Sequence, residues 1–495
     1  MGKGSKSYYL ETMGCQMNVL DSELVAGQLR RMGYVRTSRA AEADVVLLNT
    51  CSVRQHAEDK AWSRLGELRP LKRRRPDMVI GVIGCMAERD GENVLARCEH
   101  VDLVCGPGQL ARIPDLIREV IEGRGRAAAL ALSRSRRLSP EERSLALDGL
   151  EELDLSRHLF GDHRPGAYIR VQRGCDKFCT FCVVPFTRGP EVSRPPDHIV
   201  EEARRLAEAG AREVTLLGQT VNSYAYRENG RTVRLAELLE RVHEVPGIER
   251  LRFVTSYPGD FTDDILVAMR DLPKVCEYLH IPAQSGADSV LRRMKRQYTV
   301  AEYVDLIDRA RTIVPGIALA GDFIVGFPGE TEDEFEQSLE LLRRVRYKNV
   351  FVFKYSARPG TAADRHLPDD VPPTEKRRRN IRMLEAQREI SLEEHKAMVG
   401  RTVEVLVEGF SKAAIRAQQA EQNRGHEVSW RRSDQLTGRT RGDQIVVFTG
   451  PASLIGSTVA VRITAATALT LHGDLVDKRP GEDSVAAAAG PEQRR

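Results

Sequence analysis

Residues 167–182 read AYIRVQRGCDKFCTFC, and the interpretation of the whole chain starts from this stretch. The run Ala167–Val171 predicts a strand, and the loop after it holds three cysteines with the spacing C-x3-C-x2-C: Cys175, Cys179 and Cys182. Three close thiolates can bind three irons of a cubane cluster and leave the fourth iron open to an external ligand. A structural zinc site is the alternative, but it needs a fourth protein ligand. The next cysteine is the distant Cys276, so the spacing favours the cluster.

A strand-then-helix unit repeats about six times within residues 166–398, and helical patterns such as His198–Ala209 and Glu332–Val345 separate the strands. The later expected strands are Glu213–Leu217, Arg250–Thr255, Glu277–Ile281, Ile317–Val325 and Val350–Tyr355. A full eight-unit barrel needs about 250 residues. We therefore expect a partial (β/α)6 barrel, with its chemistry in the loops at the carboxyl ends of the strands.

Residues 6–123 also alternate strand and helix signals, with strands expected at 8–10, 44–48 and 78–83 and helices at 20–32 and 57–68. This alternation predicts an open α/β sheet of parallel strands. Cys15, Cys51 and Cys85 each come just after a predicted strand of this sheet. Taken singly, each is more typical of a small buried hydrophobic residue. The carboxyl ends of parallel strands lie at one edge of a sheet, so we expect the three thiols to converge there.

The remaining chain divides into three parts. Residues 124–165 are expected to form a linker with one helix, and residues 399–476 have short β-branched runs that predict a small all-β barrel. The segment 477–495 is rich in Pro, Gly, Ala and charge, which predicts a disordered tail.

Composition narrows the class of protein. The chain has 495 residues, 41% hydrophobic residues and a net charge of +4, so a wholly disordered protein is excluded. Met1–Tyr9 is not a signal peptide, and the longest apolar run, 78–87, is too short for a membrane helix, so we expect a soluble, cytoplasmic protein without membrane contact. Basic runs occur at 72–75, 134–137 and 376–379. Each alone is typical of a solvated face, but together they favour contact with RNA phosphates.

The cysteine triplet, with Phe181 before its last member, resembles that of the radical S-adenosylmethionine (SAM) superfamily. With the second trio and a C-terminal TRAM-like β-barrel, the chain from Tyr8 to Val476 is similar to the radical SAM methylthiotransferases. Three motifs look like the branch that acts on adenosine-37 of tRNA: Gly174–Pro185 with the following Thr187–Gly189, Thr50–Arg54, and Leu217–Gln219.

This resemblance implies conversion of N6-dimethylallyladenosine to its 2-methylthio derivative, with one SAM as methyl donor and one as radical source. It implies two [4Fe–4S] clusters: one at Cys175, Cys179 and Cys182 that binds SAM, and an auxiliary one at the catalytic trio Cys15, Cys51 and Cys85 that carries the sulfur. The implied partners are the tRNA anticodon loop and an electron donor such as flavodoxin or ferredoxin, acting on a monomer.

Further residues are expected to contact SAM: Phe181 beside the adenine, and four polar residues at or near strand ends, Gln219, Asn222, Ser256 and Asp322. Turn and helix-cap roles are the alternative for the polar residues. Arg358, after the sixth strand, is a candidate to face substrate.

Some positions depart from the branch, namely Thr220, Gly321 and a polar insertion over 418–434, which leaves the details of RNA docking open. Two alternatives share the chemistry but act on threonylcarbamoyladenosine in tRNA or on an aspartate of a ribosomal protein. A third alternative, from another class, is an iron–sulfur RNA-binding protein without turnover.

Overall fold

The computed structural model describes residues 6–53, 55–131, 138–156, 165–424 and 434–476. These residues divide into two compact units, one formed by the chain up to Ser391 together with 441–443, and the other by the rest of the C-terminal part. Arg54, the basic run 134–137, most of the polar insertion and the expected disordered tail lie outside the described residues.

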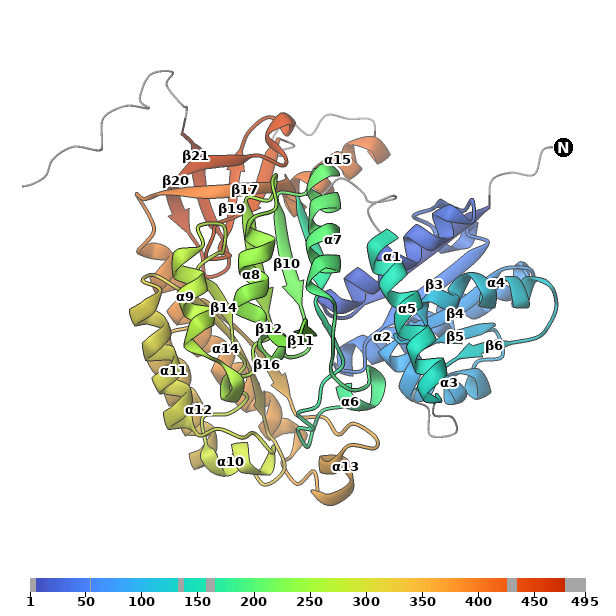
Figure 1. Cartoon of the computed structure of the whole chain (residues 1–495), viewed down its shortest axis with the longest axis horizontal. Coiled ribbons are helices and arrows are strands. Elements are labelled where there is room, and N and C mark those ends of the chain that lie inside the picture. Colours follow the sequence, from blue (N-terminus) through green and yellow to red (C-terminus); the bar gives the residue numbers. More distant parts are fainter. Residues whose placement is uncertain (1–5, 54, 132–137, 157–164, 425–433, 477–495) are drawn as a thin grey trace, which may run out of the picture. The chain divides into compact units, whose positions relative to one another are not determined.

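The first unit begins with a six-stranded parallel sheet in the order β2-β1-β3-β4-β5-β6 (Figure 1). The three expected strands are confirmed. Because helices cover both faces, the residues of β3 and β4 are all buried, and those of β1 are buried or half-buried. The sheet continues past Gly123, since its last strand lies in the segment expected to be a linker. The strands are β1 (Ser7–Met13), β2 (Val35–Arg36), β3 (Val45–Thr50), β4 (Val79–Gly84), β5 (Leu103–Cys105) and β6 (Ala127–Ala129).

Five helices accompany this sheet. The expected helices at 20–32 and 57–68 are present as α1 and α2, and the expected single helix of the linker is α5. Their bounds are α1 (Gln16–Arg31), α2 (Gln55–Arg74), α3 (Cys85–Arg97), α4 (Ile113–Ile121) and α5 (Pro140–Ser156).

The partial barrel follows, and each of its six expected strands is found within one or two residues of its expected position. They form two three-stranded parallel sheets, β13-β10-β7 and β14-β15-β16, and the amide of Ser256 bonds the carbonyl of His280 where β13 and β14 end. The strands are β7 (Gly166–Arg170), β10 (Glu213–Leu217), β13 (Arg250–Val254), β14 (Tyr278–His280), β15 (Ala318–Val325) and β16 (Asn349–Lys354).

Helices separate these strands, and the helices α11 and α12 each begin with a capping box, Thr299 with Glu302 and Thr331 with Glu334. The bounds are α6 (Val184–Thr187), α7 (Pro196–Glu208), α8 (Leu235–His243), α9 (Asp263–Asp271), α10 (Asp288–Arg293), α11 (Val300–Ile313), α12 (Glu332–Val345), α13 (Ala362–His366) and α14 (Pro373–Lys396). Two short hairpin pairs complete the unit: β8 (Gln172–Arg173) with β9 (Val192–Ser193), and β11 (Ala225–Glu228) with β12 (Arg231–Arg234).

The second unit is a closed five-stranded barrel in the order β17-β18-β19-β21-β20, which confirms the expected small β-barrel. Alternate valine and leucine side chains fill its interior. Its elements are β17 (Thr402–Phe410), α15 (Lys412–Arg424), β18 (Gln435–Arg439), β19 (Ile445–Thr449), β20 (Thr458–Ala466) and β21 (Leu471–Leu475).

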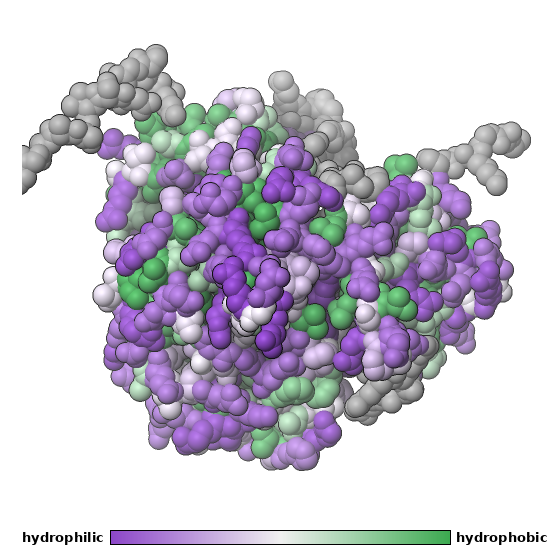
Figure 2. Space-filling model, viewed as in Figure 1, coloured by the Kyte–Doolittle hydropathy of each residue, from purple (hydrophilic) through white to green (hydrophobic). Residues whose placement is uncertain are grey.

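The surface visible in Figure 2 is mostly hydrophilic, with hydrophobic residues scattered among polar ones. None of the helices in the described ranges is long and apolar enough to span a membrane.

A buried network of ion pairs joins the N-terminal sheet domain to the barrel. Asp21 of α1 accepts hydrogen bonds from Arg170 of β7 at 2.8 Å and from Arg188 at 2.9 Å. Asp154 of α5 accepts from Arg170 at 2.8 Å and from Arg173 at 2.6 Å. Both carboxylates are 1% exposed or less. Burial alone would raise the pKa of Asp154, but the neighbouring guanidinium charges outweigh it and hold that pKa well below its usual range.

We expect Asp154→Ala to lower the free energy of unfolding by about 3–5 kcal/mol, because it removes one carboxylate partner from each of the buried guanidinium groups of Arg170 and Arg173. Urea unfolding at neutral pH measures this loss. The ionised carboxylate stabilises the fold above its unfolded-state pKa of about 4, so the difference from the wild type should shrink as the pH falls below that value.

The control is Asp115→Ala, which breaks the exposed pair with Arg118 on α4 and should leave stability nearly unchanged. Equal losses in the two variants would show that the buried network adds nothing beyond an ordinary surface pair.

Candidate functional site

The structure brings the thiols of Cys15, Cys51 and Cys85 together at the carboxyl edge of the N-terminal sheet. Cys15 precedes α1, Cys51 follows β3 directly, and Cys85 is the first residue of α3. The Cys51 thiol donates a hydrogen bond to the sulfur of Cys15, and Cys85 interacts electrostatically with both. Two of the three sulfurs thus lie at helix N-termini, where the helix dipole favours a thiolate.

These contacts give the three thiols different pKa values. The hydrogen bond from Cys51 lowers the pKa of Cys15 to about 6, in spite of burial, and the positive charge of Arg188 acts in the same direction. The same bond, together with burial, raises the pKa of Cys51, and burial raises the pKa of Cys85. One thiolate therefore forms readily at this edge, while the other two need a further positive charge to ionise.

Two asparagines hold the loops that carry this trio in place. Asn18 donates to the side chain of Asn49 at 2.9 Å and to the carbonyl of Thr50 at 3.2 Å. The glycines beside the cysteines make this packing possible, since a Cβ on Gly14 would lie 2.4 Å from the Asn18 oxygen and one on Gly84 would lie 2.5 Å from that of Asn49. These glycines therefore let the loops approach each other.

Arg188 links this trio to the barrel. It comes from the segment that follows the second cysteine triplet, and its guanidinium bonds both Asp21 and the sulfur of Cys85. Its side chain is 6% exposed. A cation held this firmly beside three cysteines stabilises negative charge on them.

The loop of Cys175, Cys179 and Cys182 depends on a glycine at its start. Gly174 has a φ of +69°, and a Cβ there would lie 2.0 Å from the carbonyl oxygen of Pro190. The Cys175 amide bonds the Gly189 carbonyl at 3.1 Å, and the Cys182 amide bonds the Cys179 carbonyl at 3.0 Å. Burial raises the pKa of Cys175 to about 11 and that of Cys182 to about 12.

Arg296 is the charged neighbour of this second trio. Its Nη1 lies 3.5 Å from the sulfur of Cys179, and its guanidinium is 4.4 Å and 5.0 Å from the ring centres of Tyr257 and Tyr298. Neither Arg188 nor Arg296 was singled out from sequence for such a role, since only the fold brings each beside a cysteine.

The donor sets fit iron–sulfur clusters. Among the described residues, no three His, Cys, Asp or Glu side chains form a ready site for a single metal ion. Each trio instead offers three thiol sulfurs, which is the donor chemistry of clusters. The pKa is raised for four of these thiols, those of Cys51, Cys85, Cys175 and Cys182, and lowered for Cys15. Bound iron would supply the positive charge that the raised thiols need to ionise.

The residues expected to contact SAM have different surroundings. Phe181 packs against Phe327, with ring centres 6.4 Å apart, in a small cluster of its own. The carboxamide of Asn222 is occupied at both ends by the backbone of Tyr257, so it joins two loops. Gln219 is half-buried beside it.

Two of these expected residues have free capacity for a ligand. The hydroxyl of Ser256 is buried without a hydrogen-bond partner among the described residues. Asp322 lies within β15, and its Oδ1 is 3.5 Å from Nε2 of His280, whose ring nitrogens are likewise buried without a hydrogen-bond partner in the described structure. Unsatisfied buried polar groups are costly, so these atoms suit a polar ligand.

Arg358 binds the loop of Cys51. Its guanidinium donates to the Val53 carbonyl at 3.1 Å and to the Gln55 side chain at 2.8 Å, and it lies 3.4 Å from Glu58. The sequence suggested a substrate contact for this arginine, but the structure shows a tie between the end of the barrel and the auxiliary trio.

The basic run at 376–379 is also largely structural. Lys376 and Arg379 are buried and pair with Asp369 and Glu330, whereas Arg377 is exposed. The run at 72–75 is divided, since Lys72 and Arg75 pair with aspartates and the two arginines between them are exposed.

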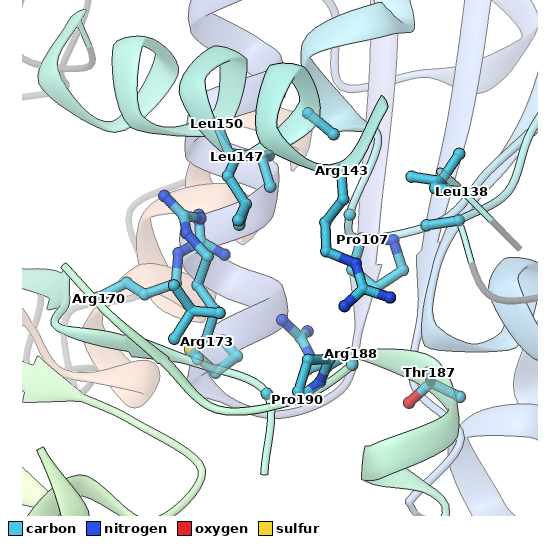
Figure 3. Close-up of a pocket in the computed structure, with 17 residues that line it drawn as sticks. Pro107, Leu138, Arg143, Leu147, Leu150, Arg170, Arg173, Thr187, Arg188 and Pro190 are labelled. Atoms are coloured by element: carbon cyan, nitrogen blue, oxygen red, sulfur yellow. The ribbon is translucent and has the colours of Figure 1, made fainter. Parts of the chain in front are cut away.

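A pocket lies between the segments that carry the two trios (Figure 3). Leu147 and Leu150 of α5 form one wall, and Figure 3 shows the arginines Arg170 and Arg173 on the opposite side. Residues next to both cysteine loops, Met17 and Gly174, line it as well. The paired carboxylates of the ion network balance most of its positive charge.

Comparison with family models defines the class. The model described as Radical SAM superfamily matches residues 169–342, that of the TRAM domain matches 426–476, and that of the Uncharacterized protein family UPF0004 matches 7–106. The solved structure of the radical SAM methyltransferase TsrM from Kitasatospora setae shares the fold with a TM-score of 0.50, at 13% identity over 73% of this chain and 74% of that one. The chain is thus a radical SAM enzyme with a TRAM domain.

Curated relatives define the family. A protein of Rhodopirellula baltica is 47% identical over 95% of both chains, and one of Syntrophotalea carbinolica is 42% identical over 93% of this chain and 98% of its own. Both are named tRNA-2-methylthio-N(6)-dimethylallyladenosine synthase. This chain belongs to the family of these synthases.

We expect Arg358→Ala to loosen the loop after Cys51, because the variant removes the bonds to Val53 and Gln55. Hydrogen–deuterium exchange should rise in the peptide that covers the start of α2. The control is Arg365→Ala on α13, which should change exchange only around Gly360, its own partner. Unchanged exchange at α2 in the Arg358 variant would contradict the assigned tie.

Proposed function

We propose that this enzyme adds a methylthio group to C2 of N6-dimethylallyladenosine at position 37 of tRNA. The observation that carries the proposal is the presence, in one compact unit, of two separate cysteine trios joined by Arg188. A radical SAM enzyme needs only the trio in the barrel, so the second trio calls for a second function. The names of the relatives supply the substrate.

Cys175, Cys179 and Cys182 would hold the cluster that binds SAM, and Cys15, Cys51 and Cys85 would hold an auxiliary [4Fe–4S] cluster. When bound, the first cluster would supply the electron for reductive cleavage of SAM, and the second would supply the sulfur of the methylthio group.

The protein's own groups would order these reactants. Arg188 and Arg296 each place a fixed positive charge beside one trio, where it stabilises the negative charge of thiolates and cluster. The free hydroxyl of Ser256 and the carboxylate of Asp322 are proposed to bind SAM, with Phe181, Gln219 and Asn222 shaping its site. Asn222 can do so only by holding the loop, since its carboxamide is occupied.

The RNA partner is proposed to be the anticodon loop of tRNA. The match to a TRAM domain and the names of the relatives support this. The exposed Arg73, Arg74 and Arg377 remain candidates for phosphate contacts. The proposal also includes action in the cytoplasm as a monomer, with flavodoxin or ferredoxin as the electron donor.

We expect Cys15→Ala/Cys51→Ala/Cys85→Ala to abolish the methylthio product while reductive cleavage of SAM continues, because the radical trio is intact. Mass spectrometry of tRNA nucleosides and chromatography of 5′-deoxyadenosine measure the two activities. Product from the triple variant would refute the auxiliary role.

Cys98→Ala serves as the control, since Cys98 is a half-buried thiol at the C-terminal end of α3, the helix that Cys85 begins, and both activities should persist. The nucleoside analysis also identifies the substrate. Methylthiolated threonylcarbamoyladenosine, or product on a ribosomal protein, would replace the proposed substrate by one of the alternatives, and the absence of 5′-deoxyadenosine would leave a non-catalytic RNA-binding protein.

We expect Gly174→Ala to lose the radical cluster, because its Cβ collides with the Pro190 carbonyl and its φ is unfavourable for alanine. Iron content and the loss of SAM cleavage report the effect. Gly210→Ala is the matched control: Gly210 has a φ of +99° but open space around its Cβ, so the variant keeps its iron. Full SAM cleavage by Gly174→Ala would contradict this role of the glycine.

A further inference from the structure

An aromatic pair lies on the inner face of the barrel. β15 and β16 are parallel, and their register pairs Asp322 with Phe351 and Ile324 with Phe353, so these four side chains share one face. The residues between them, such as Phe323, point to the opposite face and belong to the core under the helices. Phe351 and Phe353 therefore face the interior, beside Asp322.

The two rings form a shelf. Their planes differ by 18° and their centres are 6.5 Å apart, and Phe351 is 43% exposed although it belongs to a barrel strand. The ring of His280 stands edge-on to Phe351 at 6.5 Å, with an angle of 68°. An exposed aromatic surface with a polar ring at its border suits a flat heterocycle, since bases taken out of a strand stack on aromatic side chains.

Polar atoms beside the shelf can bind the edge of a base. Both ring nitrogens of His280 are buried and lack hydrogen-bond partners among the described residues, and Nε2 is 3.5 Å from Asp322. A purine offers ring nitrogens and an exocyclic N–H at its edge. The two imidazole nitrogens provide a donor and an acceptor for these atoms.

The position of β16 favours the reacting base as the ligand. Ile324, next to Phe353 in the register, packs in the same cluster as Phe181, the neighbour of Cys182. The segment that follows β16 carries Arg358, whose guanidinium bonds the carbonyl of Val53, two residues after Cys51. A base on this strand lies between the two trios. β16 is also the edge strand of its sheet.

We propose that Phe351 and Phe353 are the stacking shelf for the unstacked purine of the RNA, with His280 at its edge. This inference rests on the proposed function and specifies which residues hold the base. The shelf is a positioning device: it holds the purine flat, so that its C2 faces the reacting groups.

The test compares two anticodon stem-loops that differ only at position 37, one with N6-dimethylallyladenosine and one abasic. The holoenzyme, with clusters reconstituted, should bind the first loop roughly tenfold more tightly, or more, because stacking contributes only there. In Phe351→Leu and Phe353→Leu this preference should shrink or vanish, while affinity for the abasic loop stays unchanged. Fluorescence anisotropy measures both affinities.

Three further measurements make the result specific. Phe351→Tyr retains a ring and should restore the preference. Leu384→Ala on α14 is a control with matched exposure, 44% against 43%, and should bind both loops like the wild type. Iron content and the circular dichroism spectrum should match the wild type in the leucine variants, which shows that they fold and hold their clusters.

A leucine variant that keeps the preference, or that loses affinity for both loops equally, overturns the shelf. The proposed function fails separately, when the wild-type enzyme gives no methylthio product on tRNA. With the shelf correct, the leucine variants should make product with a raised KM for the stem-loop.

Discussion

Two buried carboxylates, Asp21 and Asp154, hold the catalytic unit together. Asp21 belongs to the first helix of the N-terminal domain, yet both of its guanidinium partners come from the barrel. A buried charge without a partner is strongly destabilising, so this pairing fixes how the two sheets meet. Because Arg188 also touches Cys85, the same interaction that joins the domains sets the electrostatic surroundings of the auxiliary trio.

This arrangement gives each trio a cation of its own. A further arginine bonds the backbone of the loop that follows Cys51. Arg188 serves the N-terminal trio and Arg296 serves the barrel trio, while Arg358 holds the loop beside Cys51. The two chemically similar trios thus have different charged neighbours beside their sulfur atoms. Such neighbours, with hydrogen bonds and local charge, set the reduction potential of an iron–sulfur cluster.

The sequence predicted the architecture well because strands and helices carry local periodic signals. All six barrel strands and the convergence of Cys15, Cys51 and Cys85 followed from such patterns. Very short strands, such as β5 with three residues, give too little periodicity and were missed. Long-range pairs were also beyond reach: Asp21 and Arg170 are 149 residues apart, and no local pattern relates them. For the same reason the sequence did not reveal the tie between Arg358 and Val53 and did not single out Phe351, whose inward direction depends on strand register.

The family models at 7–106 and 169–342 suggest separable modules, but the ion network implies otherwise. A fragment that ended before the barrel would keep Asp21 in its helix while discarding both cations that neutralise it. An isolated barrel would in turn expose Arg170 and Arg188 on a surface evolved to be covered. Cutting the chain at that junction would therefore leave each piece with charged groups that have lost their partners.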